Sequence, residues 1–190
     1  MSSNRLLVLT GGPGSGKSTL IEALARAGHA CMDEAGRGVI RDQMAIGGRA
    51  LPWEDPLAFA ELMLCWDMRS HRLARKHDGP VFLDRSVVDV LGYLRLSGLP
   101  VPPHMERAAA AFRYERRVFI LPPWPAIYTN DGERRQSPEE AERTYEAMVA
   151  IYAEQGYELV AVPRLPVEER LAFVLRESGA ARGGEQGPRG

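Results

Sequence analysis

The sequence has few cysteines and no long apolar run. Its two cysteines, Cys31 and Cys65, stand in apolar segments without CxxC spacing. We interpret both as buried thiols of a protein from a reducing compartment. No apolar run approaches the ~20 residues that a membrane-spanning helix needs, and the first apolar residues lead into a glycine turn instead of a signal-peptide core. These absences predict a cytoplasmic protein with no membrane partner.

A dominant charge of one sign is also missing, because 24 lysines and arginines face 25 aspartates and glutamates. The resulting net charge of −1 gives no bulk attraction to nucleic acid. We therefore expect no nucleic-acid partner, and any anion site must be formed locally. The four histidines show no metal-ligand spacing, and two of them, His71 and His77, are expected on a solvated helix face.

The chain does contain short apolar stretches that alternate with segments of helical periodicity. A length of 190 residues, of which 45% are apolar, suits one domain with one sizeable core. The apolar stretches predict five strands, over residues 5–10, 29–32, 81–83, 117–121 and 159–162. The other periodic stretches predict helices over residues 18–27, 36–46, 56–77, 87–96, 104–114, 138–155 and 166–177. This alternation predicts a three-layer α/β fold, a five-stranded parallel sheet with helices on both faces.

Residues 178–190 differ in composition from the rest, since they hold five glycines and no large apolar residue. Such a segment cannot bury enough apolar surface to offset the entropy of ordering it. We therefore predict a disordered tail over 178–190 and one folded domain over 1–177. We expect this domain to be a monomer or a homodimer.

Residues 11–18, "GGPGSGKS", match the phosphate-binding pattern G-x-x-x-x-G-K-[ST] in full, between a predicted strand and a predicted helix. Glycines adopt backbone angles that other residues avoid, so successive N–H groups of such a loop turn inward toward an anion. The lysine reaches the β- and γ-phosphates, and the serine hydroxyl binds Mg²⁺. The pattern predicts a site for ATP and Mg²⁺ formed by Gly12, Gly14, Ser15, Gly16, Lys17, Ser18 and Thr19.

A second motif follows the third predicted strand, where "VFLD" ends in Asp84. An aspartate at this place holds the metal ion of P-loop proteins, and the alternative is a turn aspartate with no ligand. The next residue, Arg85, is a permanent cation, whereas an ATPase motor commonly has a water-orienting glutamate there. Arg85 suits a second anion, such as the transferring phosphoryl group, and favours a kinase over a hydrolase.

A family resemblance is carried by longer pieces of the sequence: "TGGPGSGKSTLIEALARAGH", "MDEAGRGVI", "FLDRSVVDVLGYL", "NDGERRQSPEEAERTYEAMVAIYAEQGYELVAVP" and "VEERLAFVL". The chain resembles the small P-loop kinases, and more closely the small predicted AAA-type ATPases related to the nicotinamide-riboside kinase domain. The first piece is shared by all P-loop proteins, whereas the "DRS" and "DGERR" pieces are much narrower. The resemblance implies a P-loop NTPase fold with a mobile lid over ATP. It also implies phosphoryl transfer, to an acceptor that is unassigned for most members.

The resemblance further implies a catalytic base after the second strand, at the position of Glu34. A hydroxyl becomes a better nucleophile when a carboxylate can accept its proton. The adjacent Asp33 is the alternative base, and both acids could instead only cap the helix over 36–46. Arg37, one turn further on, either pairs with an acid or binds the acceptor.

In the resembling kinases a lid closes over the phosphates, and its arginines offset the charge of transfer. The matching segment is 128–140, where we favour Arg134 as the inward, catalytic arginine and Arg135 as a nucleotide contact. A solvated basic loop is the alternative. The loop after the fifth strand lines the base pocket of that fold, which assigns Pro163 to nucleotide binding, although a proline after a strand is common for local reasons. Trp124 is the best of the three tryptophans for stacking on the acceptor.

These observations predict a small kinase that transfers the γ-phosphoryl group of Mg-ATP to a hydroxyl of an unidentified small molecule, with a nucleoside-like compound leading. The predicted metal ligands are Ser18 and Asp84. The predicted catalytic residues are Lys17, Glu34, Asp84, Arg85 and Arg134. The alternative function is an ATPase or a nucleotide-dependent regulator that acts on a protein partner.

Overall fold

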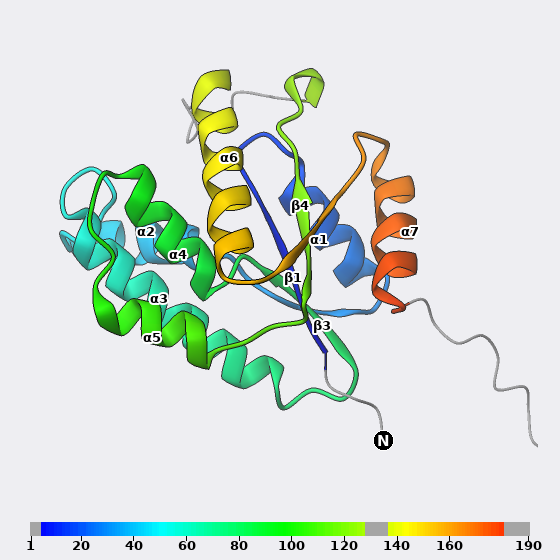
Figure 1. Ribbon diagram of the computed structural model, residues 1–190, viewed down its shortest axis with the longest axis horizontal. Coiled ribbons are helices and arrows are strands. Elements are labelled where there is room, and N and C mark those ends of the chain that lie inside the picture. The colour runs from blue at the N-terminus through cyan, green and yellow to red at the C-terminus, as the bar shows by residue number, and fades with distance from the viewer. Residues whose placement is uncertain (1–4, 128–136, 181–190) are drawn as a thin grey trace, which may run out of the picture.

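The computed structural model describes residues 5–127 and 137–180, and a single sheet of five parallel strands runs through it (Figure 1). The strands are β1 (Arg5–Gly11), β2 (Ala30–Met32), β3 (Pro80–Asp84), β4 (Arg117–Leu121) and β5 (Glu158–Ala161). Their order in the sheet is β2-β3-β1-β4-β5. The predicted α/β fold with a five-stranded parallel sheet is therefore confirmed.

Side chains of the strands alternate between two apolar cores, one on each face of the sheet. In β1, Leu6 and Val8 belong to one core, whereas Leu7 and Leu9 belong to the other. The same alternation continues in β3 and β4, because successive side chains of a strand point to opposite faces. Strands that are buried on both faces need near-continuous apolar sequence, which is why these stretches were recognisable.

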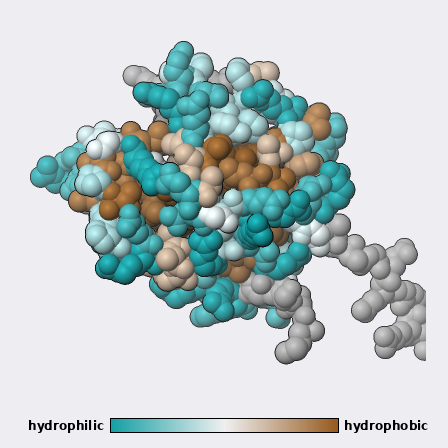
Figure 2. All heavy atoms as spheres, viewed as in Figure 1, coloured by the Kyte–Doolittle hydropathy of each residue, from teal (hydrophilic) through white to brown (hydrophobic). Residues whose placement is uncertain are grey.

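The helices complete the two outer layers (Figure 1). One face of the sheet is covered by α1 (Lys17–Arg26) and α7 (Val167–Ser178). The helices packed on the other side are α2 (Ala35–Ile46), α3 (Pro56–Ala74), α4 (Val87–Leu96), α5 (Pro103–Ala111) and α6 (Pro138–Glu154). A short 3₁₀ turn, Pro125–Ile127, follows β4. Figure 2 shows the molecule from the same side as Figure 1. Hydrophobic residues gather toward the middle of this view, and hydrophilic residues dominate its rim.

The strand order places a crevice beside the end of β1. In the sheet, β3 and β2 lie on one side of β1, and β4 and β5 lie on the other. In open parallel sheets, ligands bind beyond the carboxyl ends of the strands at such a reversal of strand order. The segments that meet there are residues 12–16, 33–37, 85–86, 122–124 and 162–164.

Two predictions about individual side chains were wrong. Cys65 is exposed and Cys31 is only partly buried, so the cysteines are not two core thiols. His71 is 5% exposed and faces the core side of α3, where its Nε2 lies 2.9 Å from the Arg113 carbonyl oxygen. Neither error alters the sheet, because α3 still packs its other apolar residues against the core.

The predicted tail begins too early. Ser178 ends α7, and Ala180 is buried in the core shared with α1. The rest of the predicted tail, residues 181–190, lies outside the described residues, as do residues 128–136 of the predicted lid. Along 5–127 and 137–180, no helix has the length and apolar character that crossing a bilayer requires.

Candidate functional site

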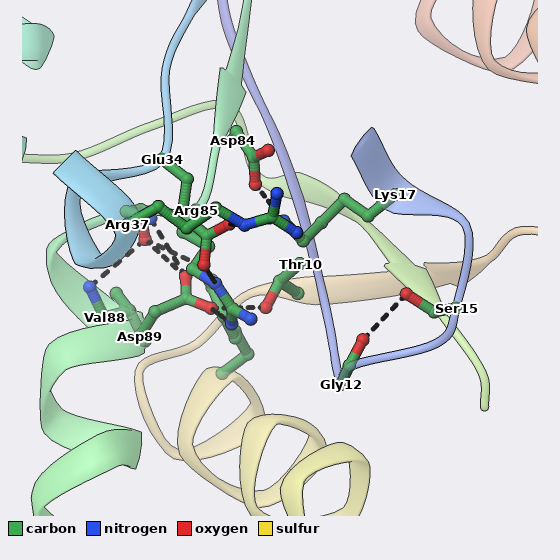
Figure 3. A network of polar contacts seen from close by, with 12 residues as sticks. Thr10, Gly12, Ser15, Lys17, Glu34, Arg37, Asp84, Arg85, Val88 and Asp89 are labelled. Atoms are coloured by element: carbon green, nitrogen blue, oxygen red, sulfur yellow. Dashed lines mark hydrogen bonds and ion pairs between the residues drawn. The ribbon is translucent and has the colours of Figure 1, made fainter. Parts of the chain in front are cut away.

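The loop between β1 and α1 is shaped by glycines at positions where a side chain would not fit. A Cβ on Gly12 would lie 2.7 Å from the Ala141 carbonyl oxygen of α6. Gly14 and Gly16 adopt φ angles of 70° and 74°, which L-residues with side chains rarely adopt. Ser15 Oγ donates to the Gly12 carbonyl oxygen at 2.8 Å and closes the turn (Figure 3). The loop thus has the backbone of a phosphate cradle, ending at a helix N-terminus.

Lys17, the first residue of α1, is held among carboxylates beneath this loop. Its side chain is 5% exposed, and its Nζ donates to Asp84 Oδ1. Glu34 Oε2 lies 3.8 Å from the same Nζ. Burial raises the pKa of Asp84, and the neighbouring Lys17 opposes that shift. Lys17, at the start of α1, and Asp84, at the end of β3, are therefore in direct contact (Figure 3).

Glu34 is the centre of a cluster of charges, which we call the Glu34 cluster: Lys17, Glu34, Arg37, Asp84 and Arg85. Arg85 Nε donates to Glu34 Oε1 at 3.0 Å, and Arg37 Nε lies 3.2 Å from Glu34 Oε2. Burial alone would raise the pKa of Glu34, but the charges of Lys17, Arg85 and Arg37 outweigh it and lower the pKa to about 2. Glu34 is therefore a carboxylate at neutral pH.

Arg85 has the one positive φ among the non-glycine residues that the structure describes, at 74°. Its N–H donates to the Leu9 carbonyl oxygen at 2.9 Å, directly after β3. A bulky residue in this conformation carries strain, and such strain concentrates at functional sites. The conformation turns the guanidinium toward Glu34 and, through Nη1 at 3.2 Å, toward Asp89.

Asp89 is a functional-site residue that the sequence analysis missed. Its Oδ1 accepts from Thr10 Oγ1 at 2.5 Å and from Arg85 Nη1 at 3.2 Å. Its Oδ2 accepts from the Ser86 backbone N–H at 3.0 Å and from the Tyr152 hydroxyl at 2.6 Å. Every lone-pair direction of this buried carboxylate is used, so Asp89 fixes Arg85 in place. The signal was present, because Ser86 and Asp89 form a capping box and Arg85 and Asp89 are four residues apart on a helix start.

Asp67, on α3, adds a further buried acid to this region. It is 5% exposed. Burial, with a further contribution from Asp89, raises the pKa of Asp67 well above its usual range. Asp67 was not singled out in the sequence, because its position in a helical apolar face is read equally well as a core position.

A second feature lies on the other side of the loop, beyond the ends of β4 and β5. It is a shallow hollow, which we call the Trp124 hollow, lined by Ser15, Leu121, Pro122, Trp124, Val162, Pro163, Arg164 and Arg170. Trp124 and Pro163 contribute apolar surface to its lining. Trp124 lines this hollow together with Ser15 and Pro163. The sequence analysis had favoured Trp124 as a stacking partner for the acceptor.

The remaining predicted residues are placed less centrally. Ser18 is half-buried at the start of α1, and Thr19 is exposed. Asp33 is exposed, while its neighbour Glu34 is 13% exposed and inside the charged cluster. This geometry favours Glu34 over Asp33 as a group that can act on a bound ligand. Arg134 and Arg135 lie outside the described residues.

The family model for the AAA domain matches residues 6–170 of the chain. No curated protein matches the sequence. Among solved structures, NadR protein in complex with NR matches with a TM-score of 0.69 at 19% identity, covering 98% of this chain and 53% of that chain. Deoxyadenosine kinase from M. mycoides matches with a TM-score of 0.62 at 13% identity, covering 92% of this chain and 99% of that chain.

Thymidylate kinase from Ehrlichia chaffeensis matches with a TM-score of 0.61 at 13% identity, covering 93% of this chain and 99% of that chain. The chain thus spans nearly all of the two small kinases and about half the length of NadR. Identities this low show a shared fold only. The glycine cradle, the parallel sheet and the match over 6–170 agree, and the chain belongs to this AAA domain family, with the fold of the P-loop nucleoside and nucleotide kinases.

Proposed function

We propose that this protein is a kinase that transfers the γ-phosphoryl group of Mg-ATP to a hydroxyl of a small molecule. The observation that carries the proposal is the contact of Arg85 with Glu34 beside Lys17, at the end of the phosphate loop. Phosphoryl transfer needs positioned cations and one proton acceptor, and little other chemistry from the protein. These groups are present together at this one place.

The phosphate loop supplies the binding site for the triphosphate. Its backbone N–H groups and the N-terminus of α1 are suited to the phosphate oxygens. Lys17 is placed to change partner, from the Asp84 carboxylate to a phosphate oxygen. Ser18 and Asp84 offer a hydroxyl and a carboxylate, the hard oxygen donors that Mg²⁺ prefers. When bound there, Mg²⁺ would neutralise charge on the phosphate oxygens.

Glu34 is the proposed proton acceptor. A carboxylate with a pKa of about 2 is a weak base, and three cations hold it there. Phosphates compete for Lys17, Arg37 and Arg85, so we expect the pKa of Glu34 to rise when the triphosphate is bound. The carboxylate then accepts the proton of the attacking hydroxyl as the oxygen–phosphorus bond forms. Glu34 would thus gain basicity only in the presence of the donor.

The acceptor belongs to a class of small hydroxyl compounds, of which nucleosides are the leading members. NadR, which has the highest TM-score among the matches given above, was solved in complex with NR, and another match is a deoxyadenosine kinase. A shikimate kinase from Acinetobacter baumannii also matches, with a TM-score of 0.57, so the fold alone accommodates different acceptors. Arg134 and Arg135 remain candidates for closing over the phosphates, on the strength of the sequence.

The proposal is tested by following labelled γ-phosphate from Mg-ATP, with nucleosides and other hydroxyl metabolites present or absent. A labelled product that needs an acceptor supports the kinase. Release of inorganic phosphate at the same rate with and without acceptors would favour an ATPase. The Lys17→Ala protein is the control, because it should lose the nucleotide-induced rise in melting temperature while keeping its fold. An unchanged rise in that variant would remove Lys17 from phosphate binding.

A further inference from the structure

Arg170 lies in α7, far along the sequence from the phosphate loop, yet its side chain reaches the back of that loop. It is 4% exposed. Its Nη1 donates to the Ser15 carbonyl oxygen at 3.3 Å and to the Gly16 carbonyl oxygen at 3.2 Å. Burial lowers the pKa of the guanidinium, and within the described residues no carboxylate forms an ion pair with it. Backbone carbonyls therefore take the place of an acidic partner.

The two carbonyls that Arg170 holds belong to the peptide planes at the centre of the loop. In a trans peptide the C=O and the N–H lie in one plane and point in opposite directions. The Ser15 carbonyl shares its plane with the Gly16 N–H, and the Gly16 carbonyl shares its plane with the Lys17 N–H. A donor that holds both carbonyls toward α7 therefore turns both N–H groups away from it. An array of such aligned N–H groups is what binds an anion.

The guanidinium is fixed from its other side by Trp124. The Arg170 Cζ lies 5.4 Å from the centroid of the Trp124 ring, within the range of a cation–π contact. Both residues line the Trp124 hollow. The Arg170 Nε is buried and has no hydrogen-bond partner in the described part of the chain. Within the described residues, the polar and aromatic contacts of this guanidinium are therefore the loop carbonyls and the Trp124 ring.

We propose that Arg170 is a positioning residue that holds the Ser15 and Gly16 carbonyls outward so that the Gly16 and Lys17 amides face the phosphates of the nucleotide. This role rests on the proposed function for the identity of the ligand. The two hydrogen bonds join α7 to the loop within the chain itself, so the proposed role of Arg170 is exerted through the loop backbone.

The test compares Arg170→Met and Arg170→Lys with Arg176→Met, a change at an exposed position of the same helix. In the free protein, the NMR order parameters of the Gly16 and Lys17 amides should fall in Arg170→Met and stay unchanged in Arg176→Met. The affinity for Mg²⁺-tripolyphosphate, which has no base, should fall by roughly tenfold or more, since charge-assisted hydrogen bonds are lost. The lysine variant should recover part of both losses, because it keeps a cation that can donate to one carbonyl.

A kinetic readout separates positioning from general destabilisation. The KM for ATP should rise in Arg170→Met while kcat at saturating ATP changes little, and a melting curve checks that the variant is folded. Unchanged order parameters and unchanged tripolyphosphate affinity in a folded Arg170→Met protein would overturn the role of Arg170 while leaving the kinase proposal intact. If the parent protein bound neither tripolyphosphate nor ATP, the kinase proposal would fail, and the order parameters of the free loop would still decide the role of Arg170.

Discussion

The two sides of the phosphate loop differ in the kind of surface they present. On the side of β3 and β2 lies the Glu34 cluster, where buried acids and cations neutralise each other. On the side of β4 and β5 lies the Trp124 hollow, which is lined mainly by apolar side chains. In the proposed kinase the charges would serve the reaction, because they act on developing charge and on protons. The apolar side chains would serve nucleotide binding. The two sides should therefore fail in different ways when altered.

The largest effect is expected from Glu34→Gln, which keeps the shape of the side chain and removes the proton acceptor. Loss of a general base typically costs about 10²–10⁴ in rate. The dissociation constant of ATP should change far less, because Glu34 does not bind the phosphates. It only competes with them for the same cations. Rapid-quench measurement of the transfer rate, with ATP affinity measured separately by calorimetry, checks both parts. Asp33→Asn is the matched control, since Asp33 is exposed. An equal transfer rate in Glu34→Gln and the parent would exclude Glu34 as the base.

The second effect is on stability, and it concerns the support of the charged side. Asp89→Asn removes the charge that faces Arg85 and leaves one acceptor oxygen where two now accept five hydrogen bonds. Hydrogen bonds to charged groups contribute about 1.5–3 kcal/mol each, so we expect a loss of that order in the free energy of unfolding. Urea unfolding measures it. Tyr152→Phe should cost less than Asp89→Asn, because it removes one donor and leaves the charge of Asp89 and its other donors in place. A larger loss in Tyr152→Phe than in Asp89→Asn would contradict the central place of Asp89.

The apolar side should respond in affinity and not in rate. Trp124→Ala removes the ring that we expect to stack on the nucleotide base, and stacking of a base on an aromatic side chain contributes about 1–3 kcal/mol. The dissociation constant of ATP should rise accordingly, with kcat at saturating ATP nearly unchanged, and with Mg²⁺-tripolyphosphate affected much less than ATP. Trp53→Ala, at an exposed position, is the control for both ligands. Equal losses for ATP and tripolyphosphate would mean that Trp124 acts on the loop and not on the base.

The smallest effect concerns His71, whose ring contacts the Arg113 carbonyl oxygen and the rings of Phe112 and Tyr114, none of which belongs to the Glu34 cluster or lines the Trp124 hollow. Burial lowers the pKa of His71 in the folded protein, despite the hydrogen bond to the Arg113 carbonyl oxygen. The unfolded chain then binds the proton at higher pH than the folded chain, so this residue makes stability fall as pH drops below about 6.5, the ordinary pKa of histidine.

The raised pKa values of Asp67 and Asp84 have the opposite sign of effect, because stability from those groups falls as pH rises. The contribution of His71 is therefore measured as the difference in free energy of unfolding between the parent and a His71 variant at each pH. Stability curves of the parent and of His71→Gln, measured by urea unfolding from pH 5 to pH 8, should converge at low pH and separate above it. A constant separation across that range would show that the proton affinity of His71 does not change on folding.

The fold was predictable because its elements carry strong local signals. The central strands β1, β3 and β4 are largely buried on both faces and are therefore nearly continuous apolar runs. Glycine ends β1, and proline directly follows β4. Ser137 begins α6 with the expected capping box, in which the Ser137 backbone N–H donates to Glu140 Oε2 at 2.8 Å. The burial of His71 was not predictable in this way, because the helical pattern of α3 does not show that residues 112–114 pack against it.

The site was predictable only where its residues form contiguous motifs. The phosphate loop and the Asp84–Arg85 pair are short contiguous patterns that can be recognised in a single sequence. The structure brings Lys17 of the loop into contact with Asp84. The contacts of Thr10 and Tyr152 with Asp89 join positions that are 79 and 63 residues apart. Arg170 reaches the loop across 154 residues. Contacts of this kind depend on how helices pack on the sheet, which one sequence does not state.

The ion pair between Lys17 and Asp84 has a consequence for which anions the free protein admits. An arriving sulfate or orthophosphate meets a lysine whose charge is already matched, and it offers nothing to the carboxylate that it would leave behind. A polyphosphate that brings its own divalent cation supplies a new partner to both groups at once. We therefore expect the Lys17–Asp84 pair to make the loop bind simple anions more weakly than the metal complex of a polyphosphate.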